Sequence, residues 1–281
     1  MRAGRPVGRE LIGPRIGART QNNESRTESI PKFLYPAHLV RISVLGNSDT
    51  VGIHLASPDL AWPALVREQL ATDLVEPVEV DSWRFAPYRP EAARYALKLV
   101  TEAQPDFVVL PIASYWCAFT TVRQNVERRL GARAAAMFSR AENAYATRVE
   151  RNDGTPGRGR TFLRKAARKT LGTAPVLTVP AFIEVYSELI RELSRREELQ
   201  VIVYGDRVFS EALRELMPGI GPVIERVEAA LKPLTLERRY LWLDLRTAFP
   251  GGQAQLGGDG IHMAPGAHEV IAEALVPLFK S

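Results

Sequence analysis

The segment Leu39–Thr50 has the sequence LVRISVLGNSDT, a run of aliphatic and β-branched residues that ends at a glycine. The run 39–45 predicts a β-strand, and Gly46 permits a tight turn where that strand ends. Four further runs of this kind follow, at residues 77–80, 107–112, 199–204 and 240–245. Because strands that alternate with helices form a parallel sheet covered on both faces, the sequence predicts an α/β fold. We expect a three-layer α/β/α sandwich whose central parallel sheet has about five strands.

Segments with helical spacing separate these strands. We expect helices at residues 57–70, 90–103, 181–196, 210–231 and 265–279. Pro90 and Pro265 stand in first turns, where the missing N–H is tolerated. Parallel sheets place ligand sites at the carboxyl ends of their strands, so the turns that follow the five strands are where chemistry is expected.

The composition excludes several classes of protein. The 281 residues include one cysteine, Cys117, which rules out an intramolecular disulfide framework and a Cys-rich zinc site. No apolar run approaches the ~18 residues that a membrane helix needs, so no transmembrane segment is expected. The N-terminus lacks the continuous apolar region of a secretory signal peptide. The cytoplasm is therefore the expected compartment.

Basic residues are concentrated in two segments, although the net charge is only +5. Residues 1–32 carry seven basic and three acidic residues, residues 121–170 carry thirteen and four, and the remainder is acidic. We expect a disordered basic tail at 1–34 and one domain at 35–281, with a basic helical insertion at about 121–170. The tail is either a floppy or misassigned start, an organelle transit peptide or a polyanion-binding arm.

The sequence leaves two interpretations of the basic insertion open. It is either a solvated helix pair that packs on the acidic body, or a lid that favours an anionic substrate or an anionic membrane surface. Nucleic-acid binding is not expected, because no helix-turn-helix, zinc or RNA-binding signature accompanies the charge.

Three residues in two of the strand-ending turns suit nucleophilic catalysis. Ser48 follows the first strand, and Asp259 and His262 stand three residues apart before the last helix. A serine hydroxyl becomes a useful nucleophile when a histidine takes its proton, and a carboxylate fixes the tautomer of that histidine. Two other histidines are expected to be structural, since His268 falls inside the last helix and His54 suits a solvent-facing or core position.

The chain resembles the SGNH hydrolases, also called the GDSL esterase/lipase family, from about Leu39 to Leu278. The sequence GNSDT at 46–50 matches the first block of the family, and DGIHMAPGAHEVIA at 259–272 matches the last. The sequence PDFVVL at 105–110 looks like the strand before the third block. The resemblance implies a flavodoxin-like sheet and a serine hydrolase that cleaves a carboxylic ester through an acyl-enzyme. Ser48, His262 and Asp259 would form its catalytic triad, and no metal or organic cofactor is implied.

The departures from the family concern the groups that bind the oxyanion. The first block reads Gly-Asn-Ser rather than Gly-Asp-Ser, residues 81–90 lack the glycine of the second block, and Ala113–Trp116 (ASYW) replaces Gly-x-Asn-Asp. Losing one oxyanion donor costs about 3–4 kcal/mol of transition-state stabilisation. The candidate donors are the main-chain N–H groups of Ser48 and Ala86 and the hydroxyl groups of Ser114 and Tyr115.

The expected substrate is a small-molecule ester, either anionic or lipid-like. Trp83, Phe85 and Trp116 are expected to form an apolar, aromatic wall of its site. Three alternatives stay open at this point. The same triad could serve an acyltransferase, the fold could persist as a catalytically weak or inactive binding or regulatory protein, or the chain could be a basic polyanion-binding protein.

Overall fold

The computed structural model describes residues 39–280, apart from 54, 75, 90, 154–168, 207–208, 210–213, 215–216, 218, 250–254 and 258–261. The chain divides into the segment Met1–Pro36 and the unit Ala37–Ser281, to which the following description refers. The tail expected at 1–34 lies outside the described residues, as do Asp259 and His54.

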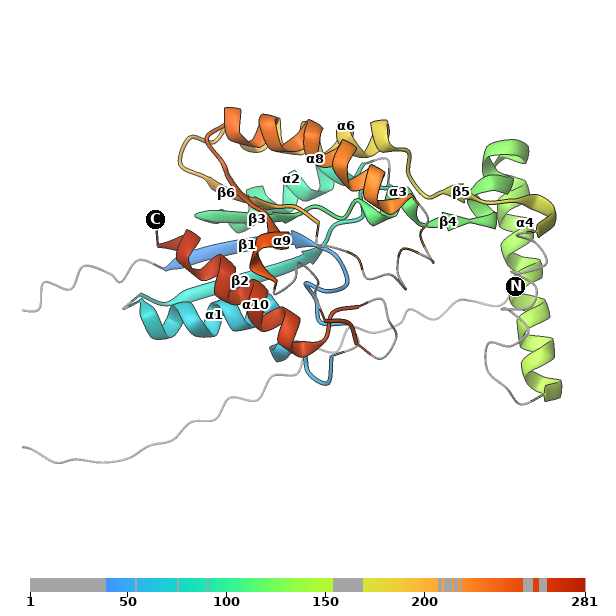
Figure 1. Cartoon of the computed structure of the whole chain (residues 1–281), viewed down its shortest axis with the longest axis horizontal. Helices are drawn as coiled ribbons and strands as arrows, with labels where there is room; N and C mark the ends of the chain where they lie inside the picture. Colours follow the sequence, from blue (N-terminus) through green and yellow to red (C-terminus); the bar gives the residue numbers. More distant parts are fainter. Residues whose placement is uncertain are drawn as a thin grey trace, which may run out of the picture. The chain divides into compact units, whose positions relative to one another are not determined.

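The described residues contain a five-stranded parallel sheet with the strand order β2-β1-β3-β6-β7 (Figure 1). The strands are β1 Val40–Gly46, β2 Val78–Arg84, β3 Phe107–Pro111, β6 Gln200–Tyr204 and β7 Leu241–Leu243. This order is the flavodoxin-like one, in which the chain reverses its direction across the sheet between β1 and β3. The predicted central sheet is confirmed, and ligands of such sheets bind at that reversal.

The second strand is longer than predicted. We expected it to end at Val80, whereas β2 continues to Arg84 and pairs with the whole of β1, as far as Gly46 opposite Arg84. β2 stands at the edge of the sheet and its residues alternate between exposed and partly buried positions. Polar residues such as Asp81 are therefore compatible with the strand.

Helices cover both faces of the sheet (Figure 1). The helices α2 Ala92–Ala103, α6 Val179–Leu193 and α8 Ile220–Glu237 share one hydrophobic core on one face. The helices α1 Trp62–Asp73 and α10 Pro265–Leu275 share the core on the other face. Short elements complete the fold, namely η1 Pro58–Leu60, α3 Tyr115–Ala118, α9 Leu245–Ala248 and η3 Val276–Phe279.

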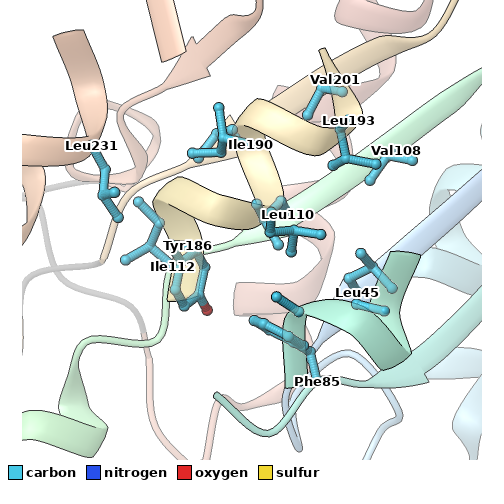
Figure 2. Packing of buried hydrophobic residues seen from close by; sticks show 14 of the residues in the cluster. Leu45, Phe85, Val108, Leu110, Ile112, Tyr186, Ile190, Leu193, Val201 and Leu231 are labelled. Carbon is cyan, nitrogen blue, oxygen red and sulfur yellow. The ribbon is translucent and has the colours of Figure 1, made fainter. Parts of the chain in front are cut away.

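The central strands are buried on both faces because successive side chains point in opposite directions. Leu45 and Leu110 belong to the core beneath α2 and α6, where Figure 2 shows them with Ile190. The preceding residues, Val44 and Val109, belong to the core beneath α1 and α10. This alternation explains why β3 and most of β6 have apolar residues at successive positions rather than at every second one.

One predicted helix is divided. We expected a helix over 57–70, but Ala61 has an extended backbone between η1 and α1. Pro63 occupies the first turn of α1, where no donor is required. The short strand β4 Thr120–Thr121 pairs antiparallel with β5 Ala174–Pro175, a ribbon too short for its sequence pattern to predict.

The basic insertion contains the helix α4 Val122–Asp153, which is interrupted at Gly131, where φ is 84°. A small apolar cluster that includes Val122, Val126 and Ala135 packs along this helix. The side chain of Asn125 donates a hydrogen bond to the carbonyl of Leu171 at 2.5 Å. This hydrogen bond connects the insertion to the segment that leads into β5.

Candidate active site

Ser48 lies in a turn that its neighbours hold at the end of β1. The Asn47 side-chain oxygen accepts a hydrogen bond from the Asp49 N–H at 2.9 Å, and the Thr50 hydroxyl donates to the Asn47 carbonyl at 2.6 Å. A Cβ atom at Gly46 would lie under 3.0 Å from the Thr50 side chain, so only glycine fits there. Asparagine and aspartate both supply the acceptor that this turn requires, which explains why Gly-Asn-Ser preserves its geometry.

His262 reaches Ser48 from a segment 214 residues further along the chain. Its Nε2 atom lies 3.0 Å from the Ser48 Oγ atom, and both side chains are partly buried. The His262 carbonyl accepts a hydrogen bond from the Gly257 N–H at 2.8 Å, and Leu256 forms an antiparallel bridge with Met263. These bonds orient the residue that precedes α10. Asp259, the expected third member, lies outside the described residues.

Asp49 links the two parts of this site, a role that the sequence did not reveal. Its side chain is buried, and its Oδ1 atom accepts a hydrogen bond from the Met263 N–H at 3.1 Å. The residue that follows Ser48 is therefore hydrogen-bonded to the residue that follows His262. The only signal in the sequence is a carboxylate next to Ser48, which a turn also explains.

A cavity with a volume of about 1230 Å³ opens beside Ser48 and His262. Trp83, Phe85 and Trp116, which we expected to form its wall, all line it. The remaining lining residues come from the turn after β1, the end of β2 with the start of α2, α3 with the residue after it, and the segment before α8. They are Asn47, Asp49, Ile53, Arg84, Ala86, Tyr88, Arg89, Glu91, Ala92, Tyr95, Tyr115, Phe119, Phe209 and Met217.

Comparison with known proteins identifies the fold. No family model and no curated protein matches the sequence. Among solved structures the chain is similar to a protein named TesA, at 16% identity and a TM-score of 0.52, over 85% of this chain and 98% of that chain. It is also similar to the lipase/acylhydrolase from Enterococcus faecalis, at 18% identity and a TM-score of 0.52, over 86% of this chain and 95% of that chain. The chain has the SGNH-hydrolase fold.

The first departure from the SGNH-hydrolase pattern is the missing glycine after β2. The Phe85 N–H is already used, since it donates to the Gly46 carbonyl at 2.6 Å. Ala86 is the next residue and lines the cavity. Among the described residues, neither the Ala86 N–H nor the Ser48 N–H has a hydrogen-bond acceptor. Both residues line the cavity, so their N–H groups stay candidates for binding the oxyanion.

The second departure replaces the asparagine of the third block. Tyr115 takes that place at the start of α3, and it lines the cavity. Ser114, the other expected hydroxyl donor, is fully buried and does not line the cavity. Its N–H donates to Asp206 Oδ2 at 3.1 Å, and its hydroxyl donates to the same oxygen. The hydroxyl of Ser114 therefore donates its hydrogen bond inside the protein rather than to the oxyanion, which corrects our expectation for this residue.

Asp206 is a second buried carboxylate that sequence reasoning missed. It follows β6 at the carboxyl edge of the sheet, the edge where we expected chemistry. Burial, with the Asp206 charge as a further cause, raises the pKa of the Cys117 thiol to about 12. The same two causes hold the pKa of Tyr186 well above its usual value, and the Tyr186 hydroxyl donates to the Pro111 carbonyl at 3.0 Å. Cys117 and Tyr186 are thus protonated at neutral pH.

The charges that line the cavity come from outside the basic insertion. Arg84 and Arg89 stand beside Glu91 and Asp49, so the described lining holds two residues of each sign. Within the described part of 121–170, no residue lines the cavity. The residues described there therefore do not contribute a basic wall to the site.

The remaining site expectations concern histidines, metals and membranes. His268 is buried in α10, and its Nδ1 atom accepts a hydrogen bond from the Trp62 N–H at 3.2 Å, which confirms a structural role. The described residues contain no group of three His, Cys, Asp or Glu side chains placed to hold a metal ion. None of the described helices is both long and apolar enough to cross a membrane.

Proposed function

We propose that this protein hydrolyses a carboxylic ester. The observation that carries the proposal is the 3.0 Å distance between Ser48 Oγ and His262 Nε2, two residues that line a large cavity. A serine hydroxyl at hydrogen-bond distance from an imidazole nitrogen is the arrangement that activates the hydroxyl for attack on an acyl carbon. The fold supports the proposal, because one of the solved structures that share it is a lipase/acylhydrolase.

In the proposed mechanism, Ser48 Oγ attacks the acyl carbon while its proton passes to His262 Nε2. The negative charge develops on the former carbonyl oxygen, where the N–H groups of Ser48 and Ala86 and the hydroxyl of Tyr115 would donate hydrogen bonds. His262 then gives the proton to the departing alcohol, which leaves an ester between the acyl group and Ser48. A water molecule, deprotonated by His262, releases the acid and regenerates Ser48.

Asp259 would complete this mechanism by accepting a hydrogen bond from the second ring nitrogen of His262. A carboxylate in that position keeps Nε2 free to accept the serine proton and stabilises the imidazolium. The same residues would act as an acyltransferase if an alcohol took the place of water in the second step.

Covalent labelling with a fluorophosphonate tests the proposal, because the probe reacts with an activated serine. We expect the wild type to take up one label per chain and Ser48→Ala to take up none. Ser194→Ala is the matched control, since the hydroxyl of Ser194 only caps α6 by donating to the Arg191 carbonyl. Turnover of p-nitrophenyl esters measures the activity directly.

A folded wild type that neither labels nor hydrolyses any ester would contradict the proposal. That outcome would favour the alternative in which the fold serves a binding or regulatory protein, an alternative suggested by the replacement of the asparagine by Tyr115. Product analysis in the presence of an added alcohol distinguishes a hydrolase from an acyltransferase, since an acyltransferase would form a new ester.

A further inference from the structure

The wall of the cavity beside Ser48 is rich in apolar side chains. Ten of the residues that line it are aromatic or large and aliphatic: Ile53, Trp83, Phe85, Tyr88, Tyr95, Tyr115, Trp116, Phe119, Phe209 and Met217. The volume of about 1230 Å³ exceeds the range of roughly 300–1000 Å³ that is usual for small-molecule sites. An acetyl group would leave most of this wall in contact with water.

Several of these rings touch one another and form a continuous aromatic face. The ring centroids of Tyr88 and Trp116 lie 4.8 Å apart, and those of Tyr115 and Trp116 lie 5.0 Å apart. Deeper in the wall, Phe85 packs edge-on against the buried Tyr186 at 5.4 Å. One ring of the lining is therefore held in place by the hydrophobic core, as a rigid binding wall requires.

The outer part of the wall exposes apolar surface to solvent. The exposed fraction is 40% for Tyr88, 59% for Tyr95 and 43% for Phe119, and all three residues line the same cavity. Exposed apolar groups that line a cavity indicate a surface that a ligand covers. A ligand that reaches these rings must extend well beyond the acyl carbon at Ser48.

The charged residues that line the cavity are balanced in sign, so they do not favour a ligand of either charge. Arg84 and Arg89 are opposed by Glu91 and Asp49 on the same wall. The apolar character of the wall is therefore the property that selects among esters.

We infer that the substrate is an ester with a bulky apolar group, either an aromatic ring or an alkyl chain of medium length, bound against the aromatic face. This inference rests on the proposed ester hydrolysis and adds the class of substrate. The bulky apolar group belongs to either the acyl or the alcohol part of the ester. Two series of substrates, each varying one of these parts, distinguish the two possibilities.

The first test compares kcat/KM for p-nitrophenyl acetate, butyrate and octanoate, which vary the acyl part, and for methyl, benzyl and naphthylmethyl acetates, which vary the alcohol part while keeping a leaving group of similar reactivity. Each fully buried methylene contributes a factor of about four. Even partial burial of an octanoyl chain therefore predicts a rise of at least about thirtyfold over acetate in the series that matches the cavity.

Variants locate the preference in the aromatic face. Tyr88→Ala, which removes an exposed ring and leaves the core intact, should lower the octanoate-to-acetate or naphthylmethyl-to-methyl ratio of kcat/KM by about threefold or more. Trp116→Ala should lower it further. Leu236→Ala is the control, since Leu236 is 52% exposed on α8 and does not line the cavity, and its ratio should equal that of the wild type.

Binding to Ser48→Ala keeps this test separate from catalysis. Quenching of tryptophan fluorescence should show tighter binding of methyl octanoate or naphthylmethyl acetate than of methyl acetate, whether or not the wild type turns over. Equal binding of the three esters, or an active wild type that prefers the smallest member of both series, would overturn the inference and leave ester hydrolysis standing. Failure of labelling and turnover would instead contradict the proposed function.

Discussion

The carboxylate of Asp49 accepts a hydrogen bond from the main-chain N–H of Met263, at 3.1 Å from the amide nitrogen. Each partner stands directly after one member of the Ser48–His262 pair. The bond therefore couples the turn that carries the serine to the segment that carries the histidine, although 214 residues separate them. We therefore expect the Ser48–His262 distance to depend on this link as well as on the two side chains themselves.

Replacement of Asp49 tests that coupling. Asp49→Ala removes the acceptor and leaves the buried Met263 N–H without its partner, which we expect to cost about 1–3 kcal/mol of stability. The rate of phosphonate labelling should fall as well, because His262 loses its fixed position. Asp49→Asn retains a side-chain oxygen and should be milder in both respects. Asp73→Ala, which removes a partly exposed ion pair with Lys280, is the control and should change stability by less than about 1 kcal/mol.

Tyr115→Phe tests the hydroxyl that takes the place of the family's asparagine. If this hydroxyl binds the oxyanion, its removal should lower kcat by about 10²–10³-fold while KM changes little. Tyr145→Phe removes a hydroxyl from α4, outside the cavity, and should leave the kinetics unaltered. An unchanged kcat in Tyr115→Phe would assign oxyanion binding to the main-chain donors alone.

Removal of the Asp206 carboxylate should destabilise the start of α3. Asp206→Ala leaves both the N–H and the hydroxyl of Ser114 without their acceptor in a fully buried position. Each unsatisfied donor costs about 1–3 kcal/mol. Thermal unfolding of Asp206→Ala, Ser114→Ala and the double variant should give a coupling energy above about 0.5 kcal/mol. Additive effects would mean that the contact between the two side chains contributes nothing.

Gly46→Ala should distort the turn that holds Ser48. The new Cβ would overlap the side chain of Thr50, which is buried and bonded to the Asn47 carbonyl. Overpacking of this kind costs about 1–3 kcal/mol, and labelling of Ser48 should slow. Combining the change with Thr50→Gly removes the overlap and should restore part of the labelling rate. A normal rate in Gly46→Ala alone would show that the turn adapts.

The stability of the fold should depend on the ionisation of Glu228. Its Oε2 atom lies 2.7 Å from Arg246, while its Oε1 atom is buried and has no hydrogen-bond partner among the described residues. Burial raises the pKa of this carboxyl, and the charge of Arg246 offsets only part of that effect. The folded state therefore binds a proton more tightly than the unfolded state, whose carboxyl has a pKa of about 4.3.

Glu228→Gln checks the sign of that dependence. For a raised carboxyl pKa, the favourable contribution is complete below the unfolded pKa and is lost as the pH rises through the folded pKa. Glutamine stays neutral, so its Tm relative to that of the wild type should increase between pH 4 and pH 8. The charge of Asp244 is one cause of the raised pKa of Glu228. The pKa of Asp244 itself is lowered, mainly by its hydrogen bond with Arg246, so Asp244 keeps its charge over most of this pH range in both proteins. A constant difference in Tm would contradict the prediction.

The sheet was predictable because its strands are buried on both faces, and this burial appears locally as runs such as 39–45 and 199–204. The full length of β2 was not predictable, since its residues up to Arg84 belong to the sheet through their pairing with β1. The ribbon of β4 and β5 depends in the same way on a partner more than fifty residues away. Local periodicity does not record such pairings.

The alternation of strands and helices, the turn that carries Ser48 and the position of His262 before the last helix could be derived from local sequence patterns. The burial of the carboxylates, and the choice of Tyr115 rather than Ser114 as a residue that lines the cavity, follow from the tertiary structure. Asp49 and Asp206 resemble ordinary turn residues until Met263 and Ser114 are brought to them. The physical reason is that a hydrogen bond across the fold depends on desolvation and distance, and both are set by the strand order rather than by neighbours in the chain.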